Sequence, residues 1–291
     1  MPDITILIQV IVSGILMGAI YSLVSIGLTI IFGVVRIVNF AHGEFLMIGM
    51  YATYFLWATL GIDPLISILI TTPLLFIIGA GIYKSLFKRV VVASDFSKIF
   101  LTVGISLVLQ NIALLLFTAN YWSVKTSYER MVLSLWGISI SYPRLIGFLG
   151  AVILSFLISL FFLKTDLGKA MRAVAQNREV AMLMGINPDR IYLIAVGLGS
   201  AVAGATGTII MPYFYVFPLV GSAFVIMCFA VVITGGLGNI KGALLCGPIF
   251  GIAESLGISF VGADSGLIVA FLILILVLIL RPSGLLEAGR L

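Results

Sequence analysis

The residues of this chain best suited to chemistry lie at 38–45, which read Val-Asn-Phe-Ala-His-Gly-Glu-Phe. This stretch holds His42, the only histidine of the chain, and Glu44, between two apolar runs that are each long enough to enter a bilayer. A titratable group beside hydrocarbon usually serves a pathway or a buried contact. The pair could act as acid and base, but no nucleophile or metal cluster accompanies it. We therefore expect no catalytic residue, metal or cofactor.

Several roles are open to the polar residues of this stretch. Positions two apart do not face each other on a helix, so an ion pair between His42 and Glu44 needs a broken backbone, which Gly43 permits. Otherwise His42 forms part of a transport pathway or satisfies a helix end, and a structural hydrogen bond is preferred over substrate contact. Asn39 either caps the following helix or touches a ligand.

Three further polar residues lie inside apolar runs. Gln110 and Asn111 belong to a run in which most polar side chains should form interhelical hydrogen bonds and a few should line the pathway. Glu254 must be protonated, paired or water-facing. It could pair with a partner subunit, line a cavity, or lie near the membrane interface.

Composition indicates what must hold these residues in place. Of 291 residues, 62% are hydrophobic and 9% are charged, whereas soluble domains have about 25% charged residues. The charge-free runs are 4–35, 64–83, 99–124, 145–163 and 191–240. A spanning helix needs about 20 apolar residues. We therefore predict an all-α polytopic membrane protein with about 8–10 transmembrane helices, forming a single transmembrane domain over 1–291 in the lipid bilayer.

The predicted membrane segments can be placed roughly. They are 5–31, 44–60, 64–83, 99–119, 145–163, 191–211, 219–235, 243–260 and 265–280. The glycine-rich stretch near 235–250 could instead be re-entrant, which would change the count. The interruptions at 33–44 and 235–242 suggest, as a hypothesis, equivalent positions in two halves of an internal repeat, and such broken segments often line transport pathways.

Basic residues predict the sidedness. The net charge of +5 is concentrated in a few short loops, which favours membrane orientation over nucleic-acid binding. The loops 84–98 and 164–190 are separated by two spans, so both can lie in the cytoplasm. Counting spans then places Asp3 and the N-terminus outside and Arg281 and the C-terminus in the cytoplasm. Loop 120–144 falls outside although it is mildly basic.

The loop at about 164–190 is too polar to span and too regular for a disordered linker. Apolar residues recur in it at helical spacing, and Gly185 followed by Pro188 is a stop signal, so we predict one short cytoplasmic helix at about 177–184. This loop could be solvated, could lie on lipid, or could dock a soluble partner through an apolar face.

The spacing Glu179-Val180-Ala181 followed by Gly185 favours docking. It resembles the Glu-Ala-Ala, three residues, Gly pattern of the coupling loop in bacterial ABC importer permeases. The whole chain resembles the permease subunit of the branched-chain amino acid ABC importers, the hydrophobic amino acid uptake family. Segments 32–45, 171–187, 235–243 and 280–285 carry the resemblance.

The resemblance implies a permease in the bacterial inner membrane that forms the pathway for Leu, Ile or Val delivered by a periplasmic binding protein. Its expected partners are a second related permease or a second copy, and two cytoplasmic ABC ATPases coupled through Glu179, Ala181, Met182 and Gly185. The chain has no Gly-x4-Gly-Lys-Ser/Thr loop, so ATP hydrolysis is expected in separate subunits. The alternatives are a related urea or short-amide importer and, more remotely, an ion-coupled transporter using Glu44 or Glu254.

Overall fold

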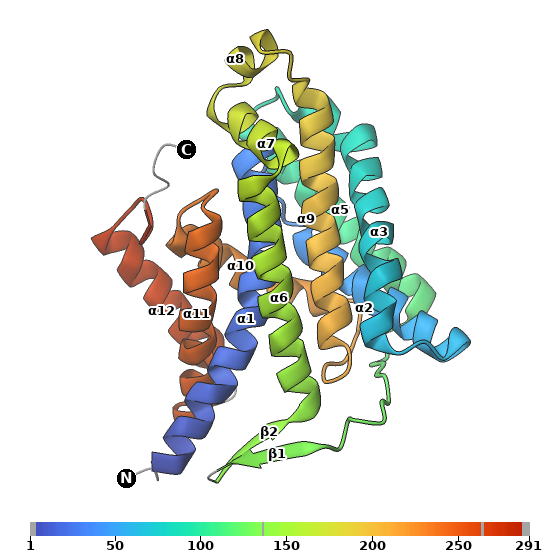
Figure 1. The fold of residues 1–291 in the computed structure, drawn as a ribbon, viewed down its shortest axis with the longest axis vertical. Helices are drawn as coiled ribbons and strands as arrows, with labels where there is room; N and C mark the ends of the chain where they lie inside the picture. Colours follow the sequence, from blue (N-terminus) through green and yellow to red (C-terminus); the bar gives the residue numbers. More distant parts are fainter. Residues whose placement is uncertain (1–3, 136, 263–264, 287–291) are drawn as a thin grey trace.

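The computed structural model describes residues 4–135, 137–262 and 265–286. The long helices are α1 (Ile4–Val35), α2 (His42–Leu60), α3 (Pro64–Ile82), α5 (Asp95–Phe117), α6 (Tyr142–Lys164), α9 (Pro188–Ile210), α10 (Val220–Gly235), α11 (Ile240–Phe260) and α12 (Ser265–Leu280). The short elements are the π-helix Tyr83–Phe87, α4 (Lys88–Val90), α7 (Asp166–Gln176), α8 (Arg178–Leu183), β1 (Val132–Leu135) and β2 (Ile138–Ser141). The two strands form an antiparallel hairpin at the foot of Figure 1.

Each of the nine predicted membrane segments corresponds to one long helix. Within the described residues, the helices long and apolar enough to cross a membrane are six, namely α1, α3 with its extension to Val90, α5, α6, α9 and α11. α10 and α12 are apolar but shorter. The peripheral helices present large apolar side chains outward, such as Leu69, Leu115 and Phe156, which are 75%, 83% and 66% exposed. The chain is therefore an all-α polytopic membrane protein.

Two helices form the centre of the bundle. In the most apolar windows of α1 and α9, 78% and 83% of residues are buried, against 22%, 17% and 22% in α3, α5 and α6. α11 packs along α1, and α3 packs along α9. Gly14 and Gly18 of α1 meet the backbone of α11 at Gly251 and Gly247. Small residues thus let the backbones of α1 and α11 approach closely.

The two basic loops meet at one end of the bundle, which we call the basic end. Lys88 Nζ lies 2.6 Å from Asp189 Oδ2 in the first turn of α9. The C-terminal segment lies there too, where the Leu285 amide donates to the Thr234 carbonyl at 2.7 Å. The opposite end, which we call the hairpin end, holds the start of α1, since the Gln9 side-chain amide donates to the Ser139 carbonyl at 2.9 Å.

Figure 1 shows α8 at one end of the bundle and the start of α1 at the other. The first described residues lie at the hairpin end and the last at the basic end, and which end faces the cytoplasm stays a prediction. Asp3, on which the sidedness prediction also rests, lies outside the described residues.

Candidate functional site

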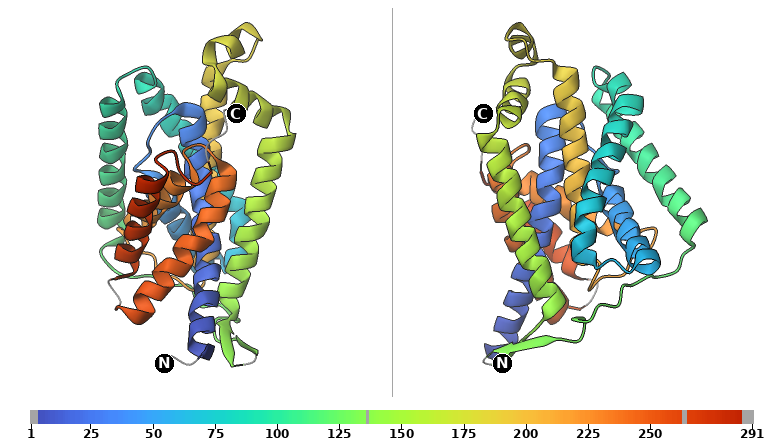
Figure 2. Two further views of the ribbon diagram at one scale, coloured as in Figure 1. Left: turned by 90° about the vertical axis from the view of Figure 1, so that its left-hand side faces the viewer. Right: turned by 45° about the vertical axis from the view of Figure 1, so that its right-hand side comes forward.

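The polar stretch 38–45 lies inside the bundle. After α1 reaches the basic end, residues 36–41 fold back, and His42 Nε2 donates to the Val24 carbonyl of α1 at 3.0 Å. Val24 lies eleven residues before the end of α1, which is about 16 Å along a helix that rises about 1.5 Å per residue. α2 therefore begins within the bundle and then runs obliquely toward the hairpin end (Figure 2).

α10 begins at the same depth from the other side. Residues 211–219 turn back from the hairpin end, where Val216 and Trp122 exchange two backbone hydrogen bonds of 2.9 and 3.0 Å. Gly221 in the first turn of α10 then meets Gly43 of α2. We call this meeting of helix starts the junction.

Two units that run through the bundle in opposite directions meet at the junction. α1, the fold-back and α2 form one unit, and α9, the connection 211–219 and α10 form the other. The internal repeat that pairs 33–44 with 235–242 stays a hypothesis; in the second of these units the break lies at 211–219. Residues 236–239 form the turn between α10 and α11, and α11 is long and apolar enough to cross a membrane. Broken helices of this arrangement line pathways in many transporters.

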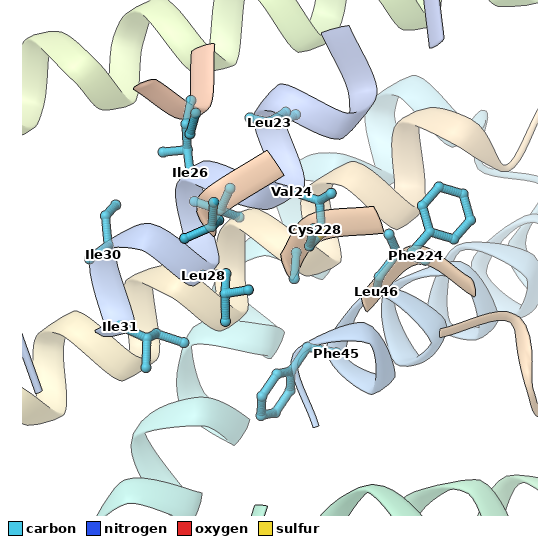
Figure 3. Packing of buried hydrophobic residues seen from close by; sticks show 14 of the residues in the cluster. Leu23, Val24, Ile26, Leu28, Ile30, Ile31, Phe45, Leu46, Phe224 and Cys228 are labelled. Atoms are coloured by element: carbon cyan, nitrogen blue, oxygen red, sulfur yellow. The ribbon is translucent and has the colours of Figure 1, made fainter. Parts of the chain in front are cut away.

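A hydrogen-bond network ties three helices together at the junction. The Glu44 side chain is fully buried and its Oε1 accepts from Ser106 Oγ at 3.0 Å and Gln110 Nε2 at 2.8 Å. Gln110 also donates to Ser222 Oγ of α10 at 3.0 Å. Apolar side chains pack on the same helices, including Phe45 of α2 and Phe224 of α10 (Figure 3). The network holds the carboxyl group in an otherwise apolar region.

The remaining candidates of this region have local roles. His42 bonds to Val24 and forms no ion pair with Glu44 among the described residues. Asn39 Oδ1 accepts from the Ala41 amide at 3.2 Å, closing the turn before α2, whose N-cap is Ala41. Asn111 is exposed and bonds to the Leu107 carbonyl of its own helix at 2.7 Å, so it lies outside the network.

Two cavities lie on either side of the junction along α1. The one at the basic end has about 1060 Å³ and is lined by Phe32, Arg36 and Lys98 among others. The one toward the hairpin end has about 380 Å³ and contains Glu254. Glu254 Oε2 accepts from the Tyr21 hydroxyl at 2.7 Å. Of the alternatives for Glu254, the structure favours the lining of a cavity.

The basic end also carries the predicted short helix, α8. Asn177 caps it, because its Oδ1 accepts from the amides of Glu179 and Val180 at 2.9 and 3.1 Å. Gly185 ends it with φ of +80°, a left-handed conformation that glycine adopts without strain. The helix predicted at about 177–184 is thus confirmed, but the prediction of one helix in this loop is wrong, because α7 precedes it.

The orientation of α8 differs from the expected one. Ala181 is only 3% exposed, because the short helix uses its smallest side chain to pack against the protein. Its exposed apolar side chains are Val180, Met182, Leu183 and Met184. Of the residues expected to couple to an ATPase, Ala181 therefore packs against the protein, whereas Gly185 is exposed. Met182 and Glu179 are exposed as a docking role requires.

Comparison with known proteins identifies the family. The family described as "Branched-chain amino acid transport system / permease component" matches residues 10–278. The chain belongs to this family. It is 31% identical to the high-affinity branched-chain amino acid transport system permease protein BraD of Pseudomonas aeruginosa, over 98% of this chain and 97% of the relative.

Two further relatives come from Escherichia coli. The chain is 29% identical to the permease protein LivH, over 96% of this chain and 95% of the relative. It is 28% identical to the permease protein LivM, over 48% of this chain and 33% of the relative. No solved structure matches the chain significantly.

Three residues of the permease's candidate site were not indicated by sequence. Tyr21 and Ser222 lie in apolar runs and belong to no motif. Arg36 ends α1 with φ of +57°, which is uncommon for a residue other than glycine, and its Nη2 donates to the Ala175 carbonyl of α7 at 3.2 Å. Its position directly before the polar stretch is the one signal that could have pointed to it.

Proposed function

We propose that this protein is the permease subunit of an ATP-driven importer of branched-chain amino acids in the bacterial inner membrane. Its family membership supports this, as do the names of BraD and LivH, which it matches over nearly their whole length. The basic end lies in the cytoplasm, following the positive-inside rule. The match to LivM supports a second related permease as a partner.

The exposed apolar side of α8 is the observation that supports coupling of the permease to an ATPase. Leu183 at the end of α8 and Met184 directly after it are 86% and 77% exposed, and Figure 1 shows α8 beyond the end of the bundle. In water such side chains favour a groove on a soluble partner. That partner is a cytoplasmic ABC ATPase, one of two in the complex, and Glu179 and Met182 belong to the same contact.

Contacts at the basic end would pass a movement of α8 to the membrane helices. α8 is followed directly by α9, whose first turn is capped by Asn187 through the Asp189 amide at 3.0 Å. α7 precedes it and contacts α1 through Arg36. α1 and α9 are the two central helices, so displacing α8 would shift both units of the junction. The ATPases must bind one arrangement better than the other for this to occur.

The pathway would then alternate between the two cavities. Glu44, Gln110 and the start of α2 lie between them, and His42 and Asn39 hold that start in place. Substrate reaches the hairpin end from a periplasmic binding protein and leaves at the basic end.

The test is uptake in vesicles that hold the permease complex, its ATPases and the binding protein. We expect leucine uptake that requires ATP and persists with an uncoupler, and that valine inhibits but urea does not. Uptake abolished by the uncoupler in the presence of ATP would favour an ion-coupled transporter, and uptake of urea alone would favour the related amide importers. Accumulation by this chain without ATPases would overturn the proposal.

A further inference from the structure

We propose that the cavity containing Glu254 is a binding site for the zwitterion of a free α-amino acid with an aliphatic side chain. The inference rests on the proposed function and specifies where and how the permease would hold its substrate.

The cavity lies in a groove between three helices. α1 forms its floor through Ser13, Leu16, Met17 and Tyr21. α11 supplies one wall with Glu254 and Ile258, and the start of α6 supplies Arg144. Figure 2 shows α6 and α11 on either side of α1. Its volume of about 380 Å³ falls within the usual range of small-molecule sites, about 300–1,000 Å³.

The two charged groups of the cavity are available to a ligand. Among the described residues, Tyr21 is the only hydrogen-bond donor to Glu254, and it bonds Oε2. Oε1 is left for another donor. Arg144 and Glu254 line the same cavity but form no ion pair with each other or with another described residue. Glu254 is half-buried within α11 and Arg144 is exposed at the start of α6, so a ligand carrying both opposite charges would pair with both.

A zwitterion fits this arrangement. Its ammonium group would donate to Glu254 Oε1, and its carboxylate would accept from the Arg144 guanidinium, which suits carboxylates through paired donors. The Tyr21 hydroxyl fixes the orientation of the Glu254 carboxylate. The apolar part of the wall, namely Leu16, Met17, Phe214 and Ile258, would face an aliphatic side chain. Urea has neither the charges nor the apolar group, so this cavity would discriminate against it.

The first test uses a cysteine reporter in the intact permease–ATPase complex in lipid nanodiscs. Ser13→Cys places a thiol in the cavity, whereas the native Cys228 and Cys246 are buried. We expect leucine to slow maleimide labelling of this thiol. 4-Methylpentanoate, which lacks the ammonium group, 3-methylbutylamine, which lacks the carboxylate, and urea should not do so at the same concentration. The control Ser134→Cys on the exposed hairpin should be labelled equally with and without leucine.

The second test changes the charges in that background. Glu254→Gln keeps the size of the side chain and Arg144→Gln removes the guanidinium. Each should raise the leucine concentration needed for protection about tenfold or more, as expected for the loss of a hydrogen bond to a charged group. Glu254→Gln should also reduce the preference for leucine over 4-methylpentanoate.

The controls Glu129→Gln and Arg130→Gln lie in the neighbouring exposed loop and should leave protection unchanged. Thermal unfolding and ATPase co-purification verify that each variant is folded and assembled.

The outcomes separate this inference from the proposed function. Normal ATP-dependent leucine uptake without protection of Ser13→Cys, or with equal protection by all four compounds, would overturn the cavity assignment alone. So would protection unchanged in both Glu254→Gln and Arg144→Gln. A wild-type complex that takes up no branched-chain amino acid would overturn the proposed function, and the assignment of the zwitterion with it.

Discussion

Gly43 and Gly221 touch backbone to backbone where α2 and α10 begin. A Cβ added at Gly43 would overlap the carbonyl oxygen of Gly221, and one added at Gly221 would overlap the carbonyl group of Gly43. The contact is therefore reciprocal, as expected where two units of opposite direction meet. It sets how closely the two helix starts approach, and hence the position of the Glu44 network.

The first prediction concerns this contact. Gly43→Ala should lower the free energy of unfolding by about 1–3 kcal/mol or more, the usual cost of overpacking. The new methyl group would meet rigid backbone rather than a flexible side chain. It should also reduce uptake. The measurements are thermal unfolding of the purified complex and leucine uptake in vesicles.

Gly104→Ala is the matched control. Gly104 lies in α5, and a Cβ there would meet nothing within 4 Å. We expect it to leave both measurements nearly unchanged. If Gly43→Ala behaves like Gly104→Ala, the junction is not closely packed.

The second prediction separates two adjacent residues of α5. Gln110→Leu removes a donor from the buried Glu44 carboxyl group and should cost about 1–3 kcal/mol, the usual cost of an unsatisfied buried polar group. Asn111→Leu should be nearly neutral, because Asn111 is exposed and bonds only within its own helix. Thermal unfolding of the two variants tests the difference. Equal destabilisation of the two variants would show that the hydrogen-bond network around Glu44 does not stabilise the junction.

Sequence predicted the parts of this fold that depend on local composition. The nine membrane segments follow from long apolar runs, most of them free of charged residues, and α8 follows from Gly185 and the helical spacing of apolar residues. The shared end of the two basic loops follows from charge and from the number of spans between them. None of these requires knowledge of which helices are neighbours.

The depth of the helix starts could not be predicted in the same way. A polar interruption such as 38–45 indicates a break, but hydropathy does not show that the chain folds back there. The matching connection at 211–219 carries no charged residue, so it is easily taken for a turn at the membrane surface. Likewise, periodicity shows that Ala181 shares a face with other apolar residues but not that this face points inward. The bond between Tyr21 and Glu254 joins residues far apart in sequence and depends on the packing of α1 with α11.

The third prediction tests α8 as the ATPase contact. Leu183→Asp should preserve folding, because the side chain is 86% exposed, but should reduce ATPase co-purification and uptake by placing a charge in an apolar groove. Val92→Asp is the control, since Val92 is 80% exposed in the loop after α4 at the same end. We expect it to retain both activities. Equal loss in the two variants would indicate a general effect of charge at the basic end.

The fourth prediction concerns the anchor between the two basic loops. Asp189 accepts from Lys88 Nζ at 2.6 Å and from the Tyr83 hydroxyl at 2.7 Å. The side chains of Lys88 and Asp189 are 55% and 46% exposed, so Lys88→Met should cost less than about 1 kcal/mol and its effect should fade in high salt. Tyr83 is 2% exposed, so Asp189→Ala should cost about 1–3 kcal/mol by leaving the Tyr83 hydroxyl unsatisfied, and most of this loss should persist in salt.

Thermal unfolding at low salt and in about 1 M salt, where charges are screened over about 3 Å, measures the losses in both variants. Lys169→Met, which removes an exposed pair within α7, is the control and should change little. A loss in Asp189→Ala that disappears in high salt would show that the anchor is an exposed ion pair only, and that the π-helix containing Tyr83 is not held to α9 through this side chain.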